Sequence, residues 1–63
     1  MRPMDLLALA EDFCMEAGCA NQFRRRYQRN RQALDIKKSV TLAISDLALT
    51  EKFAAYVDKQ PIL

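Results

Sequence analysis

A chain of 63 residues with a net charge of +2 allows one small domain. Its 51% hydrophobic and 29% charged residues, with one glycine and two prolines, exclude a disordered tail and indicate a folded, helix-rich domain. A domain of this size buries only roughly 60% of the surface of its unfolded chain, so we expect self-association to supplement the core.

The charge is unevenly distributed along the chain. Residues 1–20 carry a net charge of −3, residues 21–38 carry +6, and residues 39–63 carry −1. An acidic segment followed by a basic one predicts either mutual neutralisation or a basic face open to an anionic partner.

The first predicted helix begins at Pro3 or Met4, because proline suits the first helical turn and Asp5 places a negative charge at the positive end of the helix dipole. Gly18 predicts its end, since glycine readily adopts the positive φ that stops a helix. The apolar residues fall on one arc of this acidic helix: Leu6, Leu7, Leu9, Ala10, Phe13, Cys14 and Ala17.

A long basic helix is predicted to follow, with Asn21 as its N-cap. After Asp35 its apolar positions move by about a third of a turn. The helix then either breaks near Lys37 to Ser39, or continues and is covered on different sides along its length. The absence of Gly and Pro favours a continuous helix.

A further short helix can start near Thr50, which would be its N-cap, and Pro61 would end it before a Pro61–Leu63 tail. The alternative is one helix from Asn21 to Lys59. The predicted fold is therefore all-α: a helical hairpin of a short acidic helix and a long basic helix, with a third short helix as an open alternative, assembled as a homodimer.

Apolar residues at lengthwise packing intervals on the long helix predict a stripe that forms a core or a dimer contact. Two copies laid antiparallel would bring these stripes together. The predicted interaction residues are Phe23, Tyr27, Asn30, Leu34, Val40, Ile44 and Leu47.

The arginine run is the candidate anion or partner contact and consists of Arg24, Arg25, Arg26, Arg29 and Arg31. Guanidinium groups bind phosphate in pairs of hydrogen bonds and give salt-dependent affinity. A helix, a glycine turn and a basic helix also outline a helix-turn-helix, whose candidate readers are Arg24, Arg25, Gln28 and Arg31. The first helix would repel DNA if it faced the same way, so paired or solvated arginines and an acidic protein partner remain alternatives.

Catalysis is not expected, because the chain has no histidine, no glycine-rich phosphate loop and no metal-ligand cluster. The spacing of Cys14 and Cys19 matches neither a redox pair nor a zinc site, which predicts reduced thiols. We expect no enzyme activity, no cofactor, no metal, no signal peptide and no membrane span, and a cytoplasmic location.

The whole chain, with its acidic short helix, single-glycine turn and arginine-rich long helix, resembles the 63-residue open-reading-frame proteins of the exo-xis region of lambdoid bacteriophages. The resemblance implies a small helical homodimer, expressed early in infection and without enzymatic activity, located in the host cell cytoplasm. It also implies an influence on the host cell cycle or on the choice between lysis and lysogeny. It assigns no functional residue.

The predicted function is therefore that of a non-enzymatic phage accessory or regulatory protein, which acts through protein–protein interaction with a host factor. The alternative is a small DNA-binding regulator that uses the arginine-rich helix. As a partner, nucleic acid ranks below both a second copy of the chain and a host protein, and no membrane is expected.

Overall fold

The computed structural model describes residues 2–60, and the predicted Pro61–Leu63 tail lies outside them. These described residues form helices and turns without any strand, so the all-α prediction is confirmed. The hairpin prediction is wrong, because the chain folds into four helices: α1 (Pro3–Ala17), α2 (Ala20–Arg31), α3 (Ile36–Asp46) and α4 (Thr50–Asp58).

Helix α1 has the boundaries that its sequence predicts. Pro3 occupies the first turn, and Gly18 ends the helix with a φ of 78°. The Gly18 N–H donates to the Met15 carbonyl over 3.3 Å, and the Cys19 N–H donates to the Cys14 carbonyl over 2.9 Å. These bonds satisfy carbonyl groups that the end of a helix leaves without intrahelical partners.

The predicted long helix is broken by a turn at residues 32–35, which separates α2 from α3. The alternative break near Lys37 to Ser39 is also misplaced, because these residues lie inside α3. Asp35 is the N-cap of α3, and its Oδ1 accepts the Lys38 N–H over 2.8 Å. On the other side of the turn, Arg31 Nη1 donates to the Leu34 carbonyl over 2.6 Å. The aspartate cap and the arginine satisfy the exposed backbone groups of the turn, so neither Gly nor Pro is required to break the helix.

Helix α4 begins at Thr50 as one of the two alternatives predicted, but Thr50 is not its cap. The N-cap is Leu49 and makes no side-chain cap bond, and the chain reaches it through Ala48 at a φ of 58°. The predicted cap at Asn21 is wrong as well, because α2 begins at Ala20 with Cys19 as N-cap. In both cases the backbone turns one or two residues before the polar side chain.

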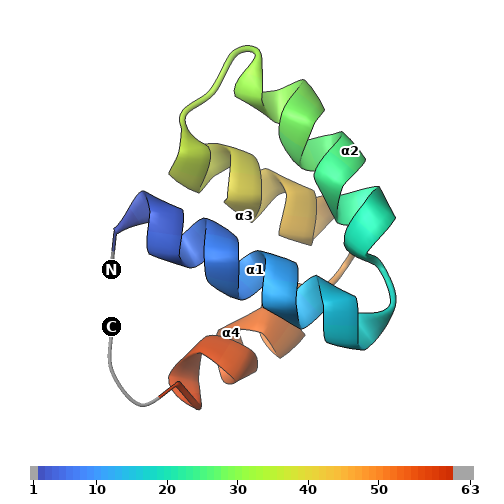
Figure 1. Ribbon diagram of the computed structural model, residues 1–63, viewed down its shortest axis with the longest axis vertical. Coiled ribbons are helices and arrows are strands. Elements are labelled where there is room, and N and C mark those ends of the chain that lie inside the picture. The colour runs from blue at the N-terminus through green and yellow to red at the C-terminus, as the bar shows by residue number, and fades with distance from the viewer. Residues whose placement is uncertain (1, 61–63) are drawn as a thin grey trace.

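The four helices surround one small core. Helices α1 and α3 lie side by side, and α2 and α4 lie on opposite sides of α1 (Figure 1). The aromatic ring of Phe13 lies 5.4 Å, between centroids, from the rings of both Phe53 and Tyr56, so it joins α1 to α4. The radius of gyration of 10.7 Å agrees with the roughly 11 Å expected for a compact domain of this length. The buried apolar residues are Ala10, Phe13, Cys14, Phe23, Val40, Ala43, Ile44 and Phe53.

No helix within residues 2–60 is long and apolar enough to cross a membrane.

Candidate functional site

The predicted stripe packs largely within a single chain. Phe23, Val40 and Ile44 are at most 2% exposed. Tyr27 and Leu47 are half-buried against this core, and the ring of Tyr27 stacks on that of Phe23 with 6.0 Å between centroids. The break at residues 32–35 folds α3 back onto α2, so the two halves of the stripe cover each other without a second copy. Homodimerisation stays a prediction.

Two polar positions of the α2–α3 seam also have partners inside the chain. Asn30, which is half-buried, directs its Nδ2 toward the Ser39 carbonyl at 3.5 Å. The buried Ser39 hydroxyl directs its proton toward the Leu34 carbonyl, also at 3.5 Å. These bonds are at the long limit for hydrogen bonds, but they leave the buried serine oxygen satisfied.

The arginine run lies on the outer side of α2. Arg24, Arg25, Arg29 and Arg31 are exposed, and Arg26 is half-buried. Within residues 2–60, one arginine of the run makes a side-chain hydrogen bond, which is the bond from Arg31 to the Leu34 carbonyl. No hydrogen bond in this part of the chain joins an arginine to a carboxylate. The guanidinium groups of the arginine run therefore do not form hydrogen-bonded pairs with the carboxylates of α1 in the described part of the chain.

Part of the run lines an open hollow of about 520 Å³, which we call the arginine surface: Gln22, Arg25, Arg26 and Arg29. Positions separated by three and four residues share one face of a helix. The four side chains therefore converge on one strip of α2, whereas Arg24 and Arg31 lie outside it.

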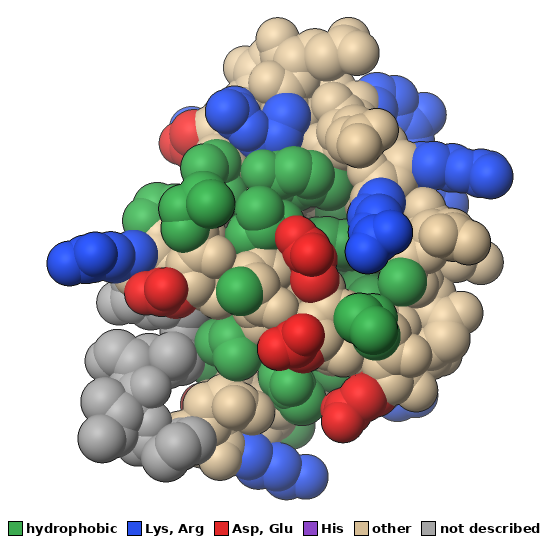
Figure 2. All heavy atoms as spheres, in the orientation of Figure 1, with side chains coloured by type: hydrophobic (Ala, Val, Ile, Leu, Met, Phe, Trp, Pro, Cys, Tyr) green, Lys and Arg blue, Asp and Glu red, His purple; other side chains and the backbone are tan. Residues whose placement is uncertain are grey.

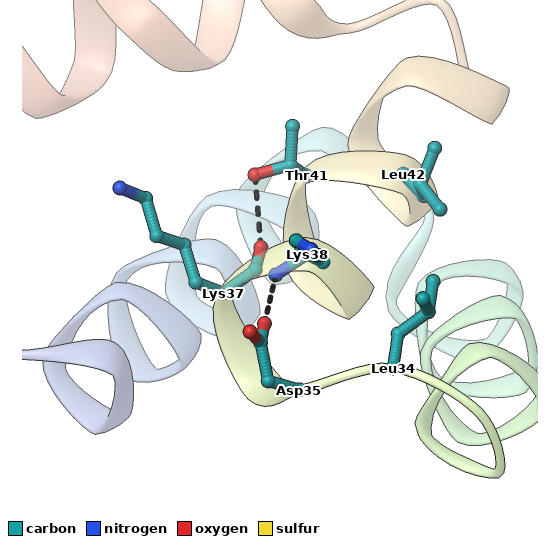
Figure 3. A pocket seen from close by; sticks show the side chains of 6 residues that line it. All are labelled: Leu34, Asp35, Lys37, Lys38, Thr41 and Leu42. Atoms are coloured by element: carbon teal, nitrogen blue, oxygen red, sulfur yellow. Dashed lines mark hydrogen bonds between the residues drawn. The ribbon is translucent and has the colours of Figure 1, made fainter.

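A second, apolar hollow of about 430 Å³ lies where the turn meets α3, and we call it the leucine groove: Leu34, Asp35, Lys37, Lys38, Thr41 and Leu42. In Figure 3, Leu34 and Leu42 lie on the same side, Lys38 is between them and Lys37, and Lys37 extends in the opposite direction. Leu42 is 43% exposed, which is high for a large aliphatic side chain.

Hydrogen bonds hold the walls of the leucine groove. The Asp35 carboxylate accepts the Lys38 N–H, and the Thr41 hydroxyl donates to the Lys37 carbonyl over 2.9 Å (Figure 3). Arg31 is tied to the Leu34 carbonyl at the edge of the groove. The positive end of the α3 dipole lies here as well, so the groove combines an apolar surface with a positive potential.

Comparison with known proteins finds no matching family model, no similar curated protein and no similar solved structure. The resemblance to exo-xis proteins stays a prediction.

The acidic residues of the first 20 positions lie on α1, whereas the arginine run lies on α2. In Figure 2, acidic side chains gather over α1 in the middle of the face, and Lys and Arg side chains lie over α2 and toward the margin, one of them next to the acidic side chains. Helix α1 contributes Asp5, Glu11, Asp12 and Glu16. Desolvation first, and then the carboxylates of Glu16 and Asp12, raise the pKa of Tyr56, which places this α4 side chain beside the acidic surface.

The two cysteines are free thiols, Cys14 buried and Cys19 half-buried. Burial first, and then the neighbouring Cys19 side chain, raise the pKa of the Cys14 thiol to about 12. A thiol in this state is a poor nucleophile, because the reactive form is the thiolate. Within residues 2–60, no cluster of three or more His, Cys, Asp or Glu side chains is placed to hold a metal ion.

The leucine groove was not predicted from the sequence. Leu34, Lys38 and Leu42 recur every four residues, which is a helical pattern, but the assumption of one continuous helix placed Leu34 in the stripe and left Leu42 unassigned. Only the turn at residues 32–35 brings Leu34 over the start of α3. Asp35, a residue that favours N-caps and stands directly before the apolar Ile36, was the available signal for that turn.

Proposed function

We propose that the protein is a non-enzymatic accessory protein that acts by binding another protein, and that its leucine groove holds an acidic amphipathic segment of that partner. The observation that carries this proposal is the exposed Leu42 in an apolar groove bordered by Arg31, Lys37 and Lys38.

The apolar part of the groove supplies the driving force for binding. Phe23, Val40 and Ile44 already lie in the chain's own core, so they do not present a surface to a partner. Leu34 is half-buried and Leu42 is exposed, and both retain area that a partner can cover. Covering a leucine side chain completely stabilises a complex by roughly 1.5–3 kcal/mol.

The charges beside the groove determine the kind of partner. Three positive charges lie beside the groove, those of Arg31, Lys37 and Lys38, and one negative charge, that of Asp35. The Asp35 carboxylate already accepts the Lys38 N–H. This positive potential favours a segment with carboxylates next to its apolar side chains and disfavours a basic one. An amphipathic helix in an apolar groove is a recurring mode of peptide recognition.

The resemblance to exo-xis proteins supplies a biological setting for this proposal. The partner would be a host protein in the cytoplasm, and binding would influence the host cell cycle or the choice between lysis and lysogeny. The protein itself would contribute recognition only, without cofactor or catalysis.

Selection of a displayed library of random 16-residue peptides on the immobilised protein tests the proposal. We expect enrichment of peptides with two large apolar residues three or four positions apart and with neighbouring Asp or Glu. Leu42→Ser should weaken binding of the enriched peptides about tenfold, which corresponds to 1.4 kcal/mol. Met15→Ser is the matched control, because Met15 is an exposed apolar residue of α1, 65% accessible, outside the groove.

Two results would overturn the proposal. One is enrichment of basic or purely polar peptides, or no enrichment at all. The other is equal binding by Leu42→Ser and the unchanged protein. Self-association that Leu42→Ser abolishes, measured by sedimentation equilibrium, would instead assign the groove to a second copy of the chain.

A further inference from the structure

We propose that the arginine surface of α2 binds the phosphodiester backbone of double-stranded nucleic acid. This site is separate from the leucine groove, with which it shares no lining residue. The inference rests on the spacing, the charge and the neighbours of Gln22, Arg25, Arg26 and Arg29.

The spacing fits a row of phosphates. With a rise of 1.5 Å per residue, Arg25 and Arg29 are separated by about 6 Å along the helix axis, and the whole surface spans about 10 Å. Duplex DNA carries one negative charge per roughly 1.7 Å of its axis, so several phosphates lie within that span. Arginine binds phosphate through two parallel N–H donors, and the Gln22 amide adds a neutral donor at one end of the row.

The charge of α2 is positive without compensation on the same helix. Its 12 residues include five arginines and no acidic residue, and the carboxylates of the domain's acidic surface belong to α1. No hydrogen bond to a carboxylate occupies Arg25, Arg26 or Arg29 in the described part of the chain. Their donors are therefore available to an incoming anion.

The aromatic residues of the chain favour duplex over single-stranded nucleic acid. Proteins that bind single strands stack bases on exposed aromatic rings. On α2, Phe23 is buried and Tyr27 is half-buried with one ring face stacked on Phe23, and neither residue lines the arginine surface. The arginine surface can contact phosphates but has no platform for unpaired bases, which predicts binding with little dependence on sequence.

The test is the fluorescence anisotropy of a labelled 20-base-pair duplex of mixed sequence, titrated with the full chain between 50 and 200 mM NaCl. Three arginine–phosphate contacts predict that log K falls with log salt with a slope of about −2.7. Arg25→Ala with Arg29→Ala removes two contacts and should bring the slope to about −0.9. Replacing both residues by Lys should keep the slope while lowering the affinity, because lysine binds phosphate as a point charge.

The control is Arg24→Ala with Lys52→Ala, which removes the same charge from residues outside the arginine surface. It should leave the slope near −2.7, about that of the unchanged protein. Leu42→Ser should also leave duplex binding unchanged, so failure of this inference and failure of the groove proposal are distinguishable.

Several outcomes would overturn the inference. These are the absence of binding at 50 mM NaCl, an equal loss in the control variant, and tighter binding of the single-stranded 20-mer than of the duplex. Equal competition by poly-glutamate at the same charge concentration would assign the surface to acidic proteins instead of phosphodiesters. Circular dichroism of each variant verifies that α2 is intact.

Discussion

The rings of Phe13 and Phe53 meet at 5.4 Å with a tilt of 50°, and this contact links the first helix of the chain to the last. Tilted aromatic pairs at this separation contribute roughly 0.5–1.5 kcal/mol beyond their buried area. Tyr56 adds a second ring against Phe13. Helix α4 is nine residues long and too short to be stable alone, so these contacts hold it on the domain.

Phe53→Ala should therefore lower the free energy of unfolding by about 3–5 kcal/mol, because it removes a buried aromatic side chain. Urea unfolding followed by circular dichroism measures this change. Met15→Ala is a suitable control, since its side chain is 65% exposed and the change should cost no more than about 0.5 kcal/mol. Equal stability of the two variants would show that α4 is not packed on Phe13.

Asp35→Ala should destabilise the domain by about 1 kcal/mol, because α3 loses the carboxylate that accepts the Lys38 N–H. Asp35→Asn retains a capping oxygen and should recover most of this loss, which separates the cap from the charge. The two variants are compared by urea unfolding. If both were as stable as the unchanged protein, the aspartate cap would not be what separates α3 from α2.

Gly18 and Ala48 both have a positive φ, at 78° and 58°. Replacing Ala48 by glycine and Gly18 by alanine should therefore change the stability of the domain in opposite directions. Ala48→Gly should stabilise the domain by about 0.5–1 kcal/mol, since relief of left-handed strain outweighs the added entropy of the unfolded chain. Gly18→Ala should destabilise it by about 1 kcal/mol through backbone strain alone, because no atom lies within 4 Å of the added methyl group. Thermal unfolding should show the two midpoints moving in opposite directions.

The Cys14 thiol predicts a loss of stability in alkali. Its pKa is raised from 9.0 to about 12, so folding favours the protonated thiol. This contribution is complete below pH 9 and disappears as the pH rises toward 12. Cys14→Ala should weaken the decline of the free energy of unfolding between these pH values, which urea unfolding at successive pH measures.

The two thiols should also differ in reactivity. In the folded protein at pH 8, iodoacetamide should modify Cys19 before Cys14, because Cys19 is half-buried and Cys14 is fully buried.

The sequence was most informative where one residue type decides the backbone. Proline at the start and glycine at the end of α1 set its limits, and both limits were predicted. The start of α4 at Thr50 was predicted as an alternative, although the cap was assigned to the wrong residue. A break was considered only near Lys37 to Ser39, and the absence of Gly and Pro favoured a continuous helix, whereas the turn lies at residues 32–35.

The turn between α2 and α3 could not be predicted locally because it depends on long-range packing. The shift of apolar positions after Asp35 was visible in the sequence and has two solutions, a straight helix covered on two sides or a turn. Folding α3 onto α2 buries Phe23, Val40 and Ile44 together, which local propensity does not encode. The arginine run was recognised as a candidate site, whereas the leucine groove depends on the turn and could not be assembled without it.

The central claim is that Phe23, Val40 and Ile44 of the predicted stripe lie in the chain's own core, whereas the leucine groove is left for a partner protein. It is tested most directly by titrating the ¹⁵N-labelled protein with the strongest-binding peptide from the display selection and following the amide resonances. We predict that the largest shifts lie within residues 34–42, and that they disappear in Leu42→Ser but not in Met15→Ser. Largest shifts on α1 or α4, or persistence of the shifts in Leu42→Ser, would contradict this account.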